Sequence, residues 1–92
     1  MYKEYKGWLQ QKVTLAEAES TNMVVDEHLG EGGVPFGFLN KEWKVLITRM
    51  VDGDELWEFS SPVETWENLS GQKGIALVRS GEVTDAIVTM MS

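Results

Sequence analysis

Several residue types and patterns are missing from this chain of 92 residues. It has no cysteine, which excludes a disulfide framework and every thiolate metal site and favours a reducing compartment. Its longest uninterrupted apolar run, residues 75–78, is far shorter than the roughly 20 residues that span a bilayer. The charged N-terminal segment also lacks an apolar signal core. We therefore expect a cytoplasmic protein with no membrane partner.

Positive charge is also scarce. Eight Lys and Arg stand against fifteen Asp and Glu, which gives a formal net charge of -7. A nucleic-acid surface needs clustered basic residues to displace counterions from phosphates. The one local concentration, Lys41, Lys44 and Arg49, falls on a predicted helix and is typical of a solvated helix face. These observations argue against a nucleic-acid partner.

The residues that are present predict one globular domain over residues 1–92. Hydrophobic residues make up 42% of the chain and charged residues 25%, as in an ordinary folded protein. A chain of this length buries roughly 60 to 65% of its unfolded surface, which is enough for one core.

The N-terminal third predicts helices. Apolar side chains and a lysine stem recur there at helical spacing: Tyr5, Trp8, Leu9, Lys12, Val13 and Ala16. Thr14 and Glu17 have the spacing of a capping box, which predicts a second helix that ends near His28 or Leu29. A single bent helix through Val13 is the alternative.

The rest of the chain predicts a linker, a helix and then a β-α-β-β unit. Residues 30–38, GEGGVPFGF, form the linker, and the helix runs over residues 41–50 with Trp43 in its apolar stripe. A strand, ELWEFS, places Trp57 and Phe59 on one face. A short helix follows, with Ser61 and Glu64 as a capping box around Pro62.

Two further strands, residues 74–79 and 83–90, meet at Ser80 and Gly81 in a two-residue turn or in a three-residue loop with a glycine bulge. A bulged loop would place one set of side chains on one face and a second set on the other. The first set is Ala76, Val78, Thr84, Ala86, Val88 and Met90, and the second is Ile75, Leu77, Val83 and Ile87.

The predicted fold class is α+β. Two or three N-terminal helices precede β-α-β-β, and a mostly antiparallel three-stranded sheet is covered by helices on one face. Because both sheet faces are apolar, the second face needs a helix or a partner. A homodimer is the expected solution, since a self-complementary patch closes with two-fold symmetry.

The motifs GDELWEF, Ser61-Pro62 with Trp66, and GIALVR, followed by the turn at Gly81, form a pattern over roughly residues 34–92. This pattern resembles one in small uncharacterised bacterial proteins. The resemblance implies a self-contained bacterial protein, and it brings no activity, cofactor or catalytic residue with it.

Polar clusters suggest little chemistry. His28 is the only histidine, and its spacing from Asp26, Glu27 and Glu31 suits a histidine near a helix C-terminus better than a metal ligand or a general base. The acidic run at residues 52–55 is typical of a turn and lacks the spacing of a calcium loop. We expect no metal and no cofactor. Four glutamates offer carboxylates whose separation the sequence leaves open: Glu55, Glu58, Glu64 and Glu67.

Aromatic residues are the best candidates for binding. Phe36 and Phe38 either cover a ligand beneath the glycine-rich loop or fill the core under it. Trp57 and Trp66, on consecutive elements, either line a pocket or oligomer contact or belong to the core. The favoured function is a non-catalytic interaction or ligand-binding module that forms a homodimer. The alternative is a small carboxylate-dependent enzyme, helped by His28, that acts on a small molecule held under the loop.

Overall fold

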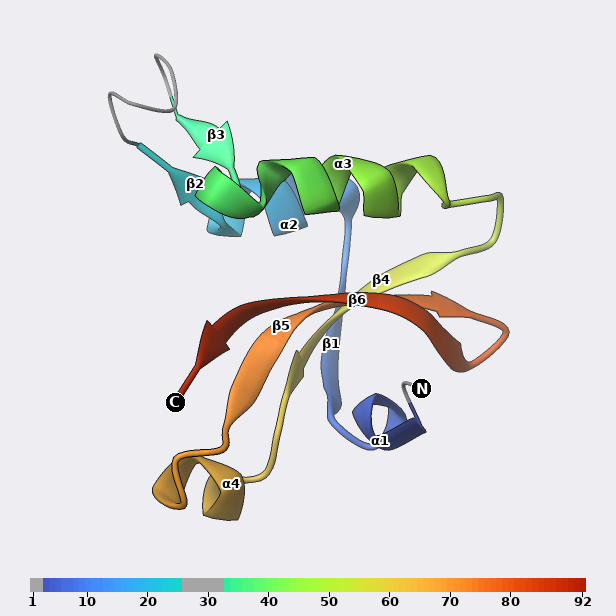
Figure 1. Cartoon of the computed structure of the whole chain (residues 1–92). Coiled ribbons are helices and arrows are strands. Elements are labelled where there is room, and N and C mark those ends of the chain that lie inside the picture. The colour runs from blue at the N-terminus through green and yellow to red at the C-terminus, as the bar shows by residue number, and fades with distance from the viewer. Residues whose placement is uncertain (1–2, 26–32) are drawn as a thin grey trace.

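The computed structural model describes residues 3–25 and 33–92. Short helices and strands are interspersed along the chain (Figure 1). The helices are α1 (Lys3–Lys6), α2 (Leu15–Thr21), the 3-10 helix η1 (Gly37–Leu39), α3 (Asn40–Thr48) and α4 (Val63–Glu67). The strands are β1 (Leu9–Val13), β2 (Met23–Val24), β3 (Val34–Pro35), β4 (Glu55–Ser60), β5 (Gln72–Arg79) and β6 (Glu82–Met91). No helix in these described ranges is long and apolar enough to cross a bilayer.

The main sheet has four antiparallel strands in the order β1-β4-β5-β6, and β2 and β3 form a separate two-stranded sheet. The prediction of two or three N-terminal helices followed by a three-stranded sheet is therefore wrong, although the protein does combine helices with an antiparallel sheet. The unpredicted strand of the main sheet is β1, whose Val13 pairs with Leu56 and whose Lys12 pairs with Trp57, and the short strands β2 and β3 lie where a helix and a linker were predicted. The backbone groups of β1 form hydrogen bonds with β4, and this long-range pairing is not visible in the local spacing of apolar residues that predicted a helix.

The second N-terminal helix exists but is shorter than predicted. The Glu17 amide donates to Thr14 Oγ1 at 3.0 Å, and the Thr14 amide donates to Glu17 Oε1 at 2.8 Å, so the capping box is confirmed. The helix ends at Thr21, with Asn22 as its C-cap, because the chain then turns into β2. The predicted helix end near His28 is thus wrong, and His28 itself lies outside the described residues.

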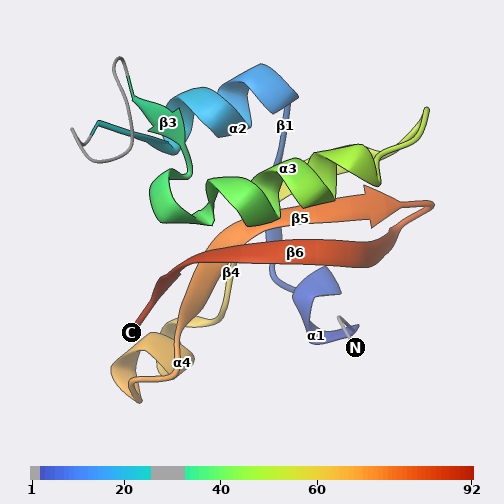
Figure 2. The ribbon, with the colours of Figure 1, turned by 45° about the horizontal axis from the view of Figure 1, so that its top comes forward.

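Helices cover both faces of the main sheet. Helices α2 and α3 lie on one face, whereas α1 lies on the other (Figures 1 and 2). The side chains packed between the sheet and α2 and α3 form what we call the upper core: Val13, Ala18, Phe36, Trp43, Leu46, Leu56, Ile75, Leu77 and Ile87. Trp43 is 1% exposed, as its place in the apolar stripe predicts.

The opposite face carries a second core, the lower core, built on Phe59, Ala76 and Val78. Helix α1 brings the Tyr5 ring to 4.8 Å from the Phe59 ring, and Trp8 stacks on Tyr5 at 5.1 Å. Partly buried side chains complete this core: Tyr5, Trp8, Leu9, Trp57, Val83, Ala86 and Val88. The aromatic residues that predicted an N-terminal helix therefore cover the second sheet face.

The hairpin between β5 and β6 is closed by the two-residue turn. Arg79 pairs with Glu82, and Ser80 and Gly81 between them both have positive φ, 52° and 81°. This geometry is that of a primed turn, which matches strand twist. Beyond the turn, Val78 pairs with Val83 and Leu77 with Asp85, so Thr84 is an extra, bulged residue. The face expected for Val83 is wrong because the two-residue turn pairs Val83 with Val78, which places Val83 in the lower core.

The predicted capping box of the short helix α4 is also wrong. Pro62 is the N-cap, and no side chain caps it. Ser61 instead accepts a hydrogen bond from the Gln72 amide at 2.9 Å, and its Oγ lies 2.6 Å from Thr65 Oγ1. Ser61 is buried, so its hydroxyl serves to tie α4 to the start of β5.

Candidate functional site

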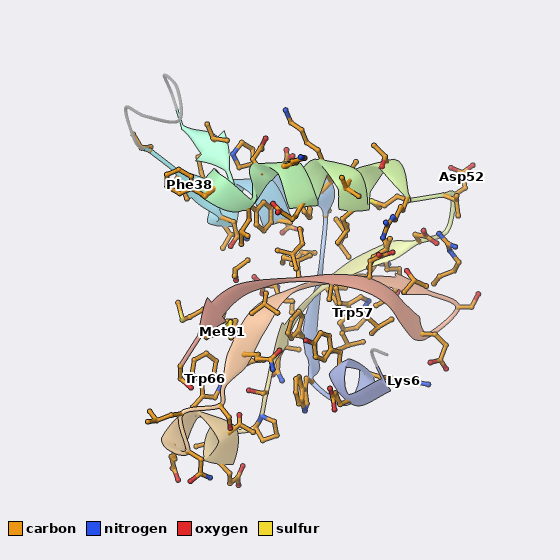
Figure 3. The ribbon with its side chains drawn as sticks, in the orientation of Figure 1. Lys6, Phe38, Asp52, Trp57, Trp66 and Met91 are labelled. Atoms are coloured by element: carbon orange, nitrogen blue, oxygen red, sulfur yellow. The ribbon has the colours of Figure 1, made fainter. Side chains whose placement is uncertain are left out.

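The four aromatic residues predicted to form a site do not lie together, and Figure 3 shows Phe38, Trp57 and Trp66 well apart from one another. Phe36 is 5% exposed and packs its ring 4.3 Å from the Trp43 ring in the upper core. Phe38, on η1, is 78% exposed. Trp57 lies in the lower core, on the opposite sheet face, and Trp66 lies on α4. The structure does not bring them together on one surface, and their part in binding stays a prediction.

Both tryptophans have structural contacts of their own. The Trp57 Nε1 donates to Glu55 Oε1 at 3.0 Å, and Glu55 Oε2 lies 3.0 Å from Lys12 Nζ. The hydrogen bond from Trp57, followed by Lys12, holds the pKa of the Glu55 carboxyl below its ordinary value. The Trp66 ring covers Gly71, where an added Cβ would lie 2.2 Å from Cδ2 of the ring.

One concave region of the described residues lies beneath α2. Three cavities of about 500, 230 and 260 Å³ all have Thr21 in their walls, and we call them together the α2 groove. The first and second share Glu58, and the second and third share Asn22 and Thr89. Of the predicted aromatic residues, Phe36 lines the third cavity.

The sheet forms the floor of this groove and brings two opposite charges to it. Glu58 pairs with Ile75, whose side chain belongs to the upper core, so Glu58 faces the same side. Lys73 is two residues before Ile75 and shares that face. Glu58 and Lys73 are thus diagonal neighbours on paired strands, with Cα atoms roughly 7 to 8 Å apart. Neither forms an ion pair with another residue in the described ranges.

A second β-bulge shapes the groove next to Lys73. Lys73 pairs with Met90 and Gly74 with Val88, which leaves Thr89 as the extra residue. Thr89 Oγ1 donates to the Lys73 carbonyl oxygen at 3.2 Å. Gly74 lies under this bulge, where an added Cβ would meet the Ile87 carbonyl oxygen at 1.9 Å. The bulge therefore requires a glycine at the groove floor.

The roof of the groove is fixed by the end of α2. The Asn22 Nδ2 donates to the Ala18 carbonyl oxygen at 2.8 Å, and the Asn22 carbonyl oxygen accepts from the Phe36 amide at 2.7 Å. On the same helix, Glu19 Oε2 accepts a 2.8 Å hydrogen bond from the Trp43 indole, which ties α2 to α3. These contacts preorganise the groove walls around its polar groups.

A different groove, of about 320 Å³, lies between α3 and β6. Leu46 and Ile87 supply its apolar floor, and the Arg49 Nη1 donates to Asp85 Oδ1 at its wall. Arg49 and Asp85 pair with each other, and the other charged residues that line this groove, Lys41 and Glu42, are neighbours on α3. The neighbouring Asp54 carboxylate accepts two hydrogen bonds from Arg79, at 2.8 and 2.9 Å.

The acidic turn is a structural feature built on that pair. Asp54 Oδ2 also accepts from the Val51 amide at 3.0 Å. The Arg79 hydrogen bonds, followed by the one from Val51, lower the pKa of Asp54 from 3.8 to about 2. Among the residues that the structure describes, no group of three or more His, Asp or Glu side chains is arranged to hold a metal ion.

Both edges of the main sheet are irregular. On β1 the register shifts between Leu9 and Gln11, which leaves Gln10 as an extra residue, and β6 has its two threonine bulges. Bulges at sheet edges hinder the addition of a further strand. The α2 groove, on a sheet face, is therefore a better candidate for binding than either edge.

No family model, curated protein or solved structure matches the chain.

The sequence shows Glu58 only as one of four glutamates, and it gives no signal that singles out Lys73. Nothing in the spacing of the two residues indicates that they meet, because they are fifteen positions apart and on different strands. The β4–β5 register brings them together, and the Gly74 in GIALVR was the one local signal of an unusual backbone nearby.

Proposed function

We propose that the protein is a small-molecule-binding module and that its ligand lies in the α2 groove. The observation that carries the proposal is the pair formed by Glu58 and Lys73. The two charges share one sheet face, line one cavity and have no ion-pair partner among the described residues. Charged groups that are close but unpaired in the free protein are suited to bind groups of a ligand.

The surroundings of the pair support a ligand of modest size. The polar residues Thr21, Asn22 and Thr89 line the same cavity as the pair. Apolar surface continues from there to Phe36 and Leu39 in the third cavity. A few fixed polar groups beside apolar walls is the usual composition of a small-molecule pocket.

The test is a thermal-shift screen of the full chain against metabolites, repeated on a variant with a blocked groove. A ligand present at ten times its Kd stabilises the native state by about 1.4 kcal/mol, which raises the Tm of a domain of this size by about 6 to 11 °C. Thr21→Trp, at the exposed last residue of α2, should fill the groove and abolish the shift.

Thr48→Trp is the matched control, because Thr48 is the exposed last residue of α3 and lines none of the grooves described above. It should leave the shift intact. A ligand that stabilises the Thr21→Trp protein as much as the wild type binds elsewhere, and this result would overturn the proposal.

Of the four glutamates considered for the enzymatic alternative, Glu58 is the one that lines this groove. If the module also catalyses a reaction of its ligand, Glu58→Gln should abolish product formation in a single-turnover assay with the ligand at saturating concentration. Unchanged chemistry in Glu58→Gln would remove the carboxylate that this alternative needs.

A further inference from the structure

We infer that the ligand of the α2 groove is a zwitterion, a free amino acid with an apolar side chain, whose ammonium group lies beside Glu58 and whose carboxylate lies beside Lys73. This inference rests on the proposed function and adds the chemical class of the ligand. It follows from the order of charged, polar and apolar groups along the groove.

The groove is divided by charge. Glu17 and Glu58 both line the first cavity, and Lys73 joins Glu58 in the second. Glu17 is held in place by its capping bond to the Thr14 amide, so its carboxylate stays at that end. A cation is therefore favoured at the first cavity, and an anion is favoured at the Lys73 end of the second.

Ligands with a single charge fit this arrangement less well. An anion bound at Lys73 would be repelled by Glu58, one diagonal step away on the sheet, and by the net charge of -7. A cation bound at Glu58 would be repelled by Lys73 over the same distance. A ligand that carries both charges is attracted by both residues. It neutralises Glu58 and Lys73, which have no ion-pair partner among the described residues.

The dimensions agree with an amino acid. The Cα atoms of Glu58 and Lys73 are roughly 7 to 8 Å apart, and both side chains are long and flexible enough to reach the two ends of a small ligand between them. The second cavity, of about 230 Å³, has room for the charged end of one amino acid, and the third cavity, of about 260 Å³, has room for its side chain.

The position of the side chain is set by the third cavity. That cavity shares Thr21, Asn22 and Thr89 with the second, and its far wall is apolar, with Met23, Phe36 and Leu39. A side chain that leaves the α-carbon toward Asn22 would therefore enter apolar surroundings. Branched aliphatic or thioether side chains suit such a wall best.

The experiment measures binding of L-leucine, of 3-methylbutylamine and of 4-methylpentanoate to the full chain by isothermal titration calorimetry. The second compound is leucine without its carboxylate, and the third is leucine without its ammonium group. Leucine should bind at least tenfold more tightly than either. Equal or tighter binding of the amine or the acid would overturn the zwitterion inference and leave the proposed binding function standing.

Charge-removing variants assign the two ends of the ligand. Lys73→Gln should weaken leucine binding at least tenfold without weakening amine binding, whereas Glu58→Gln should weaken both. The control pair, Lys12→Gln and Glu55→Gln, removes the same charges on the opposite sheet face and should change neither affinity. Folding of each variant is checked by its circular dichroism spectrum and Tm.

The remaining outcomes are also decisive. If none of the three compounds binds, the inference is overturned, while the blocked-groove test with another ligand still decides the proposed function. If leucine binds but Lys73→Gln and Glu58→Gln bind it as tightly as the wild type, leucine lies elsewhere, and the inference is equally overturned.

Discussion

Gly74 gives the sharpest prediction about what holds the sheet together. An alanine Cβ at this position would lie 1.9 Å from the Ile87 carbonyl oxygen and 3.0 Å from the Val88 Cα. Both contacts are with the backbone, so no side-chain rotation relieves them. To reach an ordinary contact distance of 3.4 Å, the oxygen would have to move by about 1.5 Å. Such a movement would distort the β5–β6 ladder beside the Thr89 bulge.

The energetic cost follows from that movement. Overpacking of a well-packed interior costs roughly 1 to 3 kcal/mol, and each disrupted ladder hydrogen bond adds roughly 0.5 to 1.5 kcal/mol. We therefore expect Gly74→Ala to lower the free energy of unfolding by about 3 to 5 kcal/mol. A domain is typically stable by only about 5 to 15 kcal/mol, so the variant should lose a large part of its stability.

Urea unfolding followed by tryptophan fluorescence measures this loss. The matched control is Gly81→Ala in the hairpin turn, where the glycine has a φ of +81° and an added Cβ would meet nothing within 4 Å. It should cost only the backbone strain of a left-handed residue, about 1 to 2 kcal/mol. If Gly74→Ala costs no more than Gly81→Ala, the steric argument for the bulge is refuted.

Three further predictions test other parts of the molecule. Phe59→Ala, in the lower core at 0% exposure, should cost about 3 to 5 kcal/mol, whereas Val63→Ala on exposed α4 should stay within about 0.5 kcal/mol; equal urea midpoints would contradict this. Asp54→Asn should be less stable than the wild type at neutral pH. The folded-state pKa of Asp54 is depressed from 3.8 to about 2, so its contribution is present above about pH 4 and lost as the pH falls toward 2; a stability gap that stays constant down to pH 2 would refute the ion-pair argument. The expected homodimer is tested by size-exclusion chromatography with light scattering, and a monomer at tens of micromolar protein would count against it.

The parts of the fold that the sequence predicted are those with a strong local pattern. Helix α3 has a regular apolar stripe around Trp43, and strand β4 alternates so that Trp57 and Phe59 share a face. Strand β1 was missed because Gln10, Gln11 and Lys12 form an exposed polar run on a sheet edge, which shows no alternation. These residues form a strand because they pair with β4, whose residues are more than forty positions away in the sequence.

The predicted capping box of α4 was wrong for a related reason. A serine before a proline and a glutamate has the same local pattern whether its hydroxyl caps the helix or bonds to another element. In the folded chain the Gln72 amide needs an acceptor where β5 begins, and Ser61 Oγ lies 2.9 Å from it. A buried amide without a partner costs more than an uncapped helix end exposed to water, so the long-range bond wins.

The candidate site depends on the same kind of long-range information. Glu58 and Lys73 become neighbours only through the β4–β5 register, and the cavity beside them is lined by the bulged Thr89 and by Gly74, which allows β6 to approach closely. A bulge that discourages strand addition at the edge of β6 thus also shapes the floor of the α2 groove. Stability and binding are consequently coupled at this point: a substitution that straightens β6 at Thr89 should alter the Lys73 end of the groove as well as the exposed edge, even though Thr89 itself carries no charge.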